Sequence, residues 1–355
     1  MAVNSSSRRV ISLACLFGGI ALMVIALILD AMKSDAPFRG AFLVIGMIAI
    51  LAGLFFFPTL KHHRTFVYVV FLFPLLFTFV VTVIIPLVLG IGYSFTDWDG
   101  IRLTKFVGFA NYGKMFSQPS FIWSILLTVL FVAFNMVLVN LVAFLLALLC
   151  TSKLRGLGFF RAAYFLPNLI GGIVLGYIWQ FIFANVVTNL TTALFDNRYS
   201  MLSESKTAFI AIIIVYIWQY AGYIMLIYIT GLNTVPGEVL EAASIDGASP
   251  MQTLFKIKIP MIAPTITICT FLTLTSAFKQ FDVNLALTNG TGSISNFLGE
   301  YLTNGTEMLA LNIYNTAVIN DNYSLGEAKA VLFFIILAVV SIVQVRISNK
   351  KEVEL

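Results

Sequence analysis

Eight apolar segments recur along the chain, each of a length that suits a membrane-spanning helix. A helix needs about 20 predominantly apolar residues to cross the hydrocarbon core of a bilayer. The segments are 11–29, 40–57, 66–93, 121–150, 166–188, 208–230, 265–287 and 325–345. Charged residues make up only 10% of the chain, whereas soluble domains contain about a quarter. The sequence therefore predicts an all-α polytopic membrane protein with about eight transmembrane helices.

The distribution of Lys and Arg predicts how these helices are oriented, because cytoplasmic loops carry an excess of both residues. If both termini are cytoplasmic, 12 of the 21 Lys and Arg residues fall in inner segments and 7 in outer segments. The net charge of +5 is then a consequence of membrane topology, since no basic cluster is long enough to indicate nucleic-acid binding. This orientation places two sizeable loops outside, 94–120 and 288–324.

One inner segment is polar and rich in helix signals, the stretch EAASIDGASPMQTLFKIKIP from Glu241 to Pro260. Pro236 suits the start of a first helix, and Gly247 permits a sharp turn at low steric cost. The run Ser249-Pro250-Met251-Gln252 has the pattern of a capping box that begins a second helix. Pro260 is expected to end this second helix. We therefore predict two short helices joined by a turn.

Two interpretations of this segment are open from the residues alone. An amphipathic helix lying on lipid is a common use of such segments. However, its apolar stripe is short, and Ala242, Ala243 and Ala248 are too small to anchor in a bilayer. Small side chains allow another backbone to come close. A docking element for a cytoplasmic partner is therefore the better physical fit.

The same segment resembles the EAA loop of ABC-importer permeases. That pattern is EAA, three residues, Gly, nine residues and then Ile-x-Leu-Pro. This chain has Glu241-Ala242-Ala243, Gly247, Ile257 and Pro260 at matching positions, with Ile259 where Leu is usual. Further likeness to the carbohydrate-uptake branch, specifically its maltose-type first permease subunit, lies in SFTDWDG, FVGFANYGKMF, FFRAAYFLPNLI, AFKQFDVNLALTNG and NIYNTAV. Thr291-Gly292 replaces the expected Gly-Pro after LTNG.

The resemblance implies a domain organisation. A six-helix type I ABC importer permease core would occupy residues 66–347, with the cytoplasmic EAA coupling loop at about 232–264. Residues 1–65 would hold two additional transmembrane helices outside this core. Residues 348–355 would form a cytoplasmic tail.

The resemblance also implies a function for the polar segment. In such permeases the EAA loop is a coupling helix that docks on a cytoplasmic ATPase subunit and transmits its closure to the membrane helices. The residues expected to carry this role are Glu241, Ala242, Ala243, Asp246, Gly247, Ile257 and Pro260. The implied partners are a second homologous permease subunit, two ATPase subunits, an extracytoplasmic sugar-binding protein and a sugar substrate. The chain itself would hold no cofactor, because ATP and Mg would bind the ATPase, and the complex would lie in the bacterial plasma membrane.

Two of the predicted spans carry polar residues at helical spacing, namely Tyr216, Gln219, Tyr220 and Tyr223, and then Thr273, Ser276 and Gln280. Such residues commonly join membrane helices through interhelical hydrogen bonds, so the spacing alone leaves two interpretations open. A sugar, however, needs neutral donors and acceptors beside aromatic rings. Matching positions in maltose-type permeases line the sugar pathway, and the resemblance adds Asn168 to this substrate site.

Other functional classes fit the sequence less well. A secondary transporter normally needs ionisable residues within its spans, and Asp and Glu are absent from the predicted span centres. An intramembrane enzyme needs a nucleophile with a base, a metal set or paired carboxylates at depth, and none is apparent. An importer for another polar solute, such as glycerol phosphate, remains an alternative. We expect a transport subunit without enzymatic activity that moves a mono-, di- or oligosaccharide by alternating access.

Overall fold

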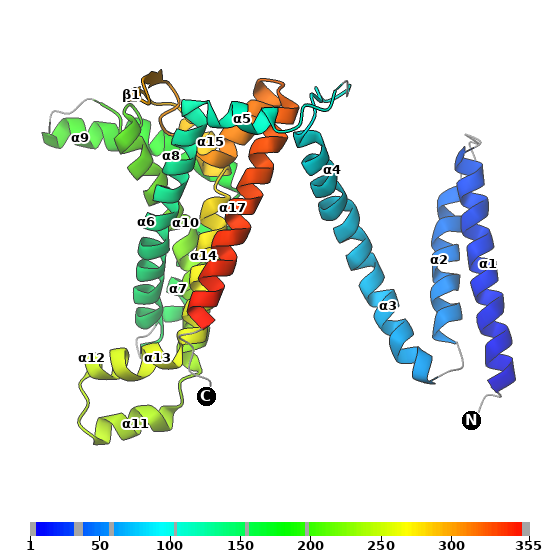
Figure 1. Ribbon diagram of the computed structural model, residues 1–355. Helices are drawn as coiled ribbons and strands as arrows, with labels where there is room; N and C mark the ends of the chain where they lie inside the picture. Colours follow the sequence, from blue (N-terminus) through cyan, green and yellow to red (C-terminus); the bar gives the residue numbers. More distant parts are fainter. Residues whose placement is uncertain are drawn as a thin grey trace. The chain divides into compact units, whose positions relative to one another are not determined.

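The computed structural model describes residues 5–31, 38–56, 60–102, 105–152, 156–195 and 199–349, and the chain divides into two compact units, Met1–Val88 and Leu89–Leu355. Helices dominate the described residues, as predicted. Figure 1 shows the helices of both units. The predicted division into residues 1–65, a core at 66–347 and a tail stays a prediction. Residues 350–355 of that tail, and Lys33, Lys153, Arg155 and Arg198, lie outside the described residues.

In the first unit, α1 (Ser5–Ala31) and α2 (Arg39–Phe55) pack against each other through small residues. The Ser12 hydroxyl donates to the Gly53 carbonyl at 2.5 Å. A Cβ atom at Gly46 would lie 2.9 Å from the carbonyl oxygen of Gly19, closer than real Cβ atoms come. Small residues that let two backbones approach are typical of helix association in membranes. This hairpin therefore depends on its glycines.

The third apolar segment is a continuous helical run. It comprises α3 (Leu60–Phe79), the π-helical segment η1 (Val80–Ile84) and α4 (Ile85–Ser94). Pro86 follows directly after the start of α4. A proline has no backbone N–H and therefore cannot donate the usual i→i−4 hydrogen bond. The π-helical turn η1 before Pro86 therefore interrupts no hydrogen bond that this residue could donate.

In the second unit, α6 (Pro119–Cys150), α10 (Ser205–Asn233) and α14 (Ala263–Phe278) pack together around the main core. The side chains of Phe131, Ile212 and Met225 are fully or almost fully buried there. Helix α7 (Leu157–Leu169) crosses α10 so closely that a Cβ atom at Gly222 would collide with the backbone carbonyl of Tyr164. Helix α17 (Tyr323–Asn349) packs against α14 and against α5 (Ala110–Phe116).

Two of the predicted spans are interrupted, which corrects the sequence analysis. The segment 166–188 breaks at Ile170–Gly171 between α7 and α8 (Gly172–Phe181), which continues as η2 (Ile182–Val187) and α9 (Thr188–Phe195). The segment 265–287 breaks between α14 and α15 (Asp282–Thr288). Non-helical backbone at membrane depth is tolerated where it is buried in protein or lines a cavity. The residues of the second break, Lys279 to Phe281, do line a small pocket.

The predicted outer loop 288–324 contains regular secondary structure. It contains a two-stranded antiparallel hairpin, β1 (Ile294–Phe297) and β2 (Glu300–Leu302), whose register pairs Ile294 with Leu302. The turn residues Leu298 and Gly299 both have positive φ, as tight hairpin turns require. Helix α16 (Leu309–Tyr314) and the π-helical η4 (Asn315–Ile319) follow.

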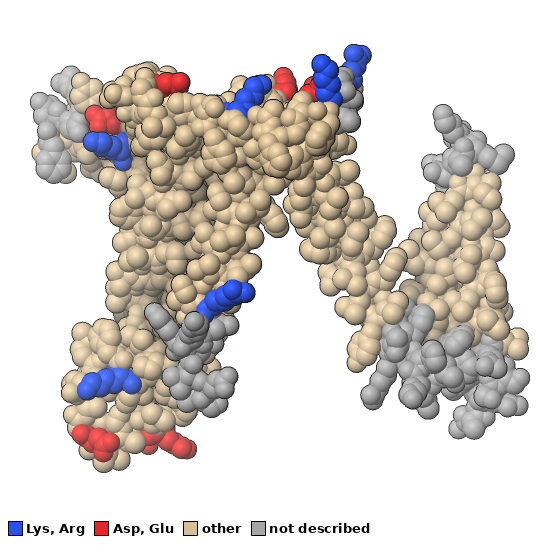
Figure 2. Space-filling view, in the orientation of Figure 1, with Lys and Arg blue, Asp and Glu red and all other residues tan. Residues whose placement is uncertain are grey.

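Within the described residues, six helices are long and apolar enough to cross a membrane, or seven if the bent pair ending in α14 counts as one span. Two shorter apolar helices, Gly40–Phe55 and Leu309–Ile319, fall below this length. The predicted count of eight is therefore approximate, although each predicted span corresponds to helical structure. On the face shown in Figure 2, the charged side chains of the second unit gather at its two ends, with a long uncharged zone between them.

Candidate functional site

The polar segment predicted from the sequence forms two short helices at one end of the second unit (Figure 1). The first, α11 (Gly237–Ile245), has Pro236 as its N-cap residue. It ends in a Schellman motif: the Ala248 N–H donates to the Ala243 carbonyl at 2.9 Å, and the Gly247 N–H donates to the Ser244 carbonyl at 3.1 Å. Gly247 has φ +74°, the left-handed conformation that this motif needs.

The second helix starts with the predicted capping box. The Ser249 hydroxyl accepts from the Gln252 N–H at 3.3 Å, and the Gln252 side chain accepts from the Ser249 N–H at 2.7 Å. This helix comprises α12 (Pro250–Thr253), the π-helical η3 (Leu254–Lys258) and α13 (Ile259–Met261). The prediction that Pro260 ends it is wrong by one residue. The π-helical turn before Pro260 accommodates the proline, and the chain bends by 72° only after Met261.

The exposure of this segment separates two kinds of side chain. Ala243 is buried and Ile257 is half-buried, whereas Glu241, Ala242, Asp246 and Pro260 are exposed. Three large apolar side chains are also exposed, Ile245 by 86%, Met251 by 66% and Phe255 by 61%. Figure 2 shows basic and acidic side chains on the same segment. The segment therefore presents apolar and charged groups on one stiff, capped support.

Three of the predicted substrate residues meet at a small pocket. Gln219 and Tyr220 reach it from α10, and Gln280 reaches it from the break after α14. Gln280 therefore does not share a helical face with Thr273 and Ser276, because α14 ends at Phe278. The rings of Tyr216 and Tyr220 stack with their centroids 4.4 Å apart. The pocket is also lined by Gly172, Lys279, Phe281, Asp282 and Val283.

This pocket has a volume of about 110 Å³, which is below the range of about 300–1,000 Å³ for small-ligand sites. In this conformation it is too small for a sugar. Two buried polar groups beside it have no hydrogen-bond partner among the described residues, the Tyr216 hydroxyl and the Gln280 amide nitrogen. Such groups are normally satisfied by a partner or by water. Of the two residues, Gln280 lines the pocket, whereas Tyr216 is fully buried behind Tyr220 and does not line it.

The structure places Thr273 away from this pocket, in an interhelical network. The Asn140 amide of α6 donates to the Thr273 hydroxyl at 3.2 Å, and the Tyr228 hydroxyl of α10 donates to Asn140 at 3.0 Å. The network joins α6, α10 and α14, which is the helix-joining role that the sequence left open for these residues. Asn140 was not predicted, because it shares no helical face with another polar residue: Asn135, in the same apolar run, is five positions away.

The remaining predicted residues are dispersed. Asn168 is half-buried near the end of α7, Tyr223 is half-buried on α10, and Ser276 is half-buried on α14. None of the three lines the small pocket. Their role in a substrate pathway stays a prediction.

A second polar cluster, which the sequence analysis missed, lies at the end of the unit opposite α11–α13. Lys329, near the start of the predicted span 325–345, is only 2% exposed in the second turn of α17. Glu307 is 4% exposed and accepts hydrogen bonds from three asparagine side chains. In the sequence, Lys329 is a charged residue at the edge of an apolar run, and such a residue indicates a buried polar partner.

Comparison with known proteins identifies the family. Residues 115–352 match the family described as binding-protein-dependent transport system inner membrane component. The chain is 40% identical over 289 residues to the probable starch degradation products transport system permease protein AmyD of Thermoanaerobacterium thermosulfurigenes, a match that covers 81% of this chain and 96% of that protein. It is 31% identical over 271 residues to the multiple sugar-binding transport system permease protein MsmF of Streptococcus mutans, covering 76% of this chain and 90% of that protein.

The fold has a relative among solved structures. A bacterial ABC transporter involved in the import of the acidic polysaccharide alginate contains a chain that superposes with a TM-score of 0.69 at 18% identity, covering 81% of this chain and 96% of that one. This likeness shows the fold of an ABC importer permease and confirms the predicted fold class. The relatives are transport permeases, so neither the enzyme nor the secondary-transporter interpretation is favoured. The chain therefore belongs to the family of binding-protein-dependent transport system inner membrane components, the permeases of ABC importers.

Proposed function

We propose that this chain is a permease subunit of an ATP-driven sugar importer in the bacterial plasma membrane, and that it moves a mono-, di- or oligosaccharide into the cytoplasm. The names of the two relatives, which refer to starch degradation products and to multiple sugars, support this substrate class. The apolar helices support a multi-pass membrane protein. The excess of Lys and Arg in alternate loops supports cytoplasmic termini.

The observation that carries the proposal is the geometry of α11–α13. Its two caps hold both short helices rigidly, so that a force applied to them can pass to α14 through a bend of 72°. Exposed Ile245, Met251 and Phe255 offer the apolar centre that a protein interface needs, and Glu241 offers a charge for its rim. This combination supports docking on an ATPase subunit.

The proposed assembly contains a second homologous permease, two ATPase subunits and an extracytoplasmic sugar-binding protein. ATP and Mg²⁺ bind the ATPase subunits, and this chain holds no cofactor of its own. Closure of the ATPase dimer moves α11–α13, and the membrane helices alternate between outward and inward access. The family's dependence on a binding protein supports this composition.

The pocket at Gln219, Tyr220 and Gln280 is the proposed substrate position along this path. Its present volume of about 110 Å³ matches a closed state that must widen before a sugar enters. The stacked Tyr216 and Tyr220 rings supply an aromatic face, and the unpartnered Gln280 amide supplies a donor. Lys279 and Asp282 line the same pocket with opposite charges, which favours a neutral sugar over glycerol phosphate.

The first test is to purify the tagged chain from its native membrane in mild detergent and to identify stoichiometric partners by mass spectrometry. We expect a second permease and an ATPase. The helices α11–α13 (residues 237–261) are called the coupling segment below. The purified complex, reconstituted with the binding protein in vesicles, should take up sugar only when ATP is supplied on the side of the membrane where the coupling segment lies. A chain that purifies alone, from a preparation in which other ABC complexes survive, contradicts the proposal. Uptake of glycerol phosphate in place of sugar would assign the alternative substrate.

A further inference from the structure

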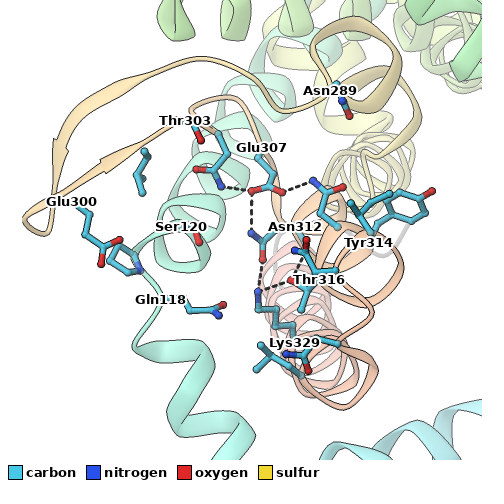
Figure 3. A pocket seen from close by; sticks show the side chains of 18 of the residues that line it. Gln118, Ser120, Asn289, Glu300, Thr303, Glu307, Asn312, Tyr314, Thr316 and Lys329 are labelled. Carbon is cyan, nitrogen blue, oxygen red and sulfur yellow. Dashed lines mark hydrogen bonds between the residues drawn. The ribbon is translucent and has the colours of Figure 1, made fainter. Parts of the chain in front are cut away.

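A second cavity lies at the end of the Leu89–Leu355 unit opposite the coupling segment, and it is larger than the pocket described above. Its volume is about 830 Å³. The start of α6, hairpin strand β2, the segment leading to α16, and the start of α17 all contribute to its walls. Figure 3 shows Ser120, Thr303, Asn312 and Lys329 around the same space. This volume falls within the range of about 300–1,000 Å³ for small-ligand sites.

The inner part of this cavity is built around the Glu307 carboxylate. The side-chain amides of Asn312 and Asn315 donate to it at 3.0 Å and 2.6 Å, and the Asn304 amide donates to it as well. These three amide donors satisfy acceptor positions of a carboxylate that is buried away from water. Each asparagine uses its nitrogen on Glu307, and within the described residues the amide oxygens of Asn304 and Asn315 accept no hydrogen bond. These oxygens are available acceptors.

The Lys329 ammonium group lies on the other side of Asn312. It donates to the Asn312 amide oxygen at 2.8 Å and to the Thr316 hydroxyl at 2.7 Å (Figure 3). It also lies 5.1 Å from the centre of the Phe121 ring. Asn312 thus bridges a buried anion and a buried cation. Because each charge has polar partners, the network is a rigid and nearly neutral inner wall.

The outer part of the cavity adds neutral polar groups and aromatic rings. Amide and hydroxyl side chains come from Gln118, Ser120, Asn289 and Thr303, and rings come from Tyr301 and Tyr314. A neutral sugar requires this combination, because its hydroxyls pair with amides and its C–H faces stack on rings. Glu300 and Glu307 together outnumber Lys329 among the ionisable lining residues, so an anionic ligand is disfavoured.

We propose that this cavity is a second carbohydrate site, which receives a neutral oligosaccharide from the binding protein before it reaches the pocket at Tyr220. The proposal rests on the function proposed above, because it assumes that sugar enters from this end. A protein segment is the other conceivable occupant. It fits less well, since the buried centre of a protein interface is apolar and depleted in charge, whereas this cavity has a buried ionic network at its centre.

The test places a fluorescent reporter in the cavity of the complete complex. Thr303 is exposed and lines the cavity, so Thr303→Cys is labelled with an environment-sensitive dye in lipid nanodiscs, without ATP or binding protein. Ser295→Cys, exposed on β1 and outside the cavity lining, is the matched control. Cys150 and Cys269 are buried, and Cys15 is replaced by Ala to keep labelling specific. Maltotriose is the first probe, followed by any other neutral sugar that the complex imports.

We expect a saturable response to sugar at Thr303 and none at Ser295. Ser120→Trp, which fills part of the cavity, should raise the concentration for half-maximal response by about tenfold or more, the change that 1.4 kcal/mol of lost binding energy produces. An absent response at Thr303, in a complex that imports the same sugar, overturns this inference and leaves the proposed function standing. In a second measurement sugar-free binding protein is added, and a response at Thr303 to this protein but not to sugar also overturns the inference. A complex that imports no sugar overturns both.

Discussion

At one end of the Leu89–Leu355 unit, the coupling segment is shaped by hydrogen bonds between residues at most five positions apart, such as Ala248 to Ala243 and Ser249 to Gln252. At the other end, hydrogen bonds between residues far apart in the chain join the elements that contribute the walls of the large cavity. The Trp123 indole donates to the Gly305 carbonyl from 182 positions away, and the Leu309 N–H donates to the Thr128 hydroxyl from 181 positions away. The first end is exposed and locally determined, and the second is buried and determined by tertiary contacts.

This difference suits the two proposed tasks. A docking element must keep its shape while it moves as one rigid body. The local caps of α11 and α12 maintain this shape even when the membrane helices rearrange. A sugar site must instead respond to the arrangement of several helices, because alternating access rearranges them. The comparison predicts that changes at the coupling segment affect transport with little effect on stability. Changes in the buried network should lower the stability of the fold as well as affect sugar binding.

The largest expected effect on transport comes from Gly247→Pro. Proline locks φ near −65°, whereas Gly247 has φ +74°, so the Schellman motif cannot form and the two short helices lose their relative orientation. We expect ATP-driven uptake in reconstituted vesicles to be lost while membrane insertion and yield stay normal. Gly237→Ala is the control, because a Cβ atom there meets nothing within 4 Å. Full uptake by the Gly247 variant would show that this turn is not part of the coupling path.

Replacing Asn312 with Leu tests the other end. The substitution removes the bridge between Glu307 and Lys329 and leaves both charged groups short of partners in a buried site. A hydrogen bond to a charged group contributes about 1.5–3 kcal/mol, so we expect the free energy of unfolding to fall by about that amount for each of the two bonds removed. Thermal unfolding in detergent measures this change. Asn320→Leu, at an exposed position on the same cavity, should change stability by no more than about 0.5 kcal/mol. Equal melting of both variants would refute the role of the bridge.

Tyr220→Ala addresses the pocket between the two ends. It removes the ring stacked on Tyr216 and opens one wall of the pocket. Aromatic contacts contribute about 0.5–1.5 kcal/mol, so we expect the sugar concentration for half-maximal uptake to change by up to about tenfold. Binding of the ATPase subunit should be normal. Tyr177→Ala, an exposed ring on α8, serves as the control. Unchanged uptake of every sugar tested would remove Tyr220 from the pathway.

The smallest effect is expected for Ser249→Ala. Loss of the capping box should destabilise the start of α12 by about 1 kcal/mol, the usual value for an N-cap serine. Hydrogen exchange at the Gln252 amide should then accelerate by roughly fivefold, with the cavity end unaffected. Ser244→Ala, exposed on α11, should show no such change. A change in exchange at Glu307 or Asn312 would break the distinction between a local end and a tertiary end.

The sequence by itself determined the helical membrane class, the family, and the caps and the turn that shape α11 and the start of α12. Each depends on near neighbours in the chain: apolar run length for the spans, and Pro236, Gly247 and Ser249 for the caps and the turn. It also predicted Gln219, Tyr220 and Gln280 as substrate residues, and the structure brings these three together at the small pocket, although the sequence placed Gln280 on the same helical face as Thr273.

Only the tertiary structure decided where helices break and which polar residues meet. The breaks at Ile170–Gly171 and at Lys279–Phe281 lie in runs that are apolar enough to span a membrane. The backbone N–H and C=O groups that lose their helical partners there lie inside the protein, where α7, α8, α10 and α15 pack together. The Glu307–Asn312–Lys329 network likewise joins residues from three elements with no shared periodicity. Spacing along one helix reports which side chains share a face. It does not predict which face of another helix these side chains will contact. The large cavity is formed by contacts of this kind between several elements.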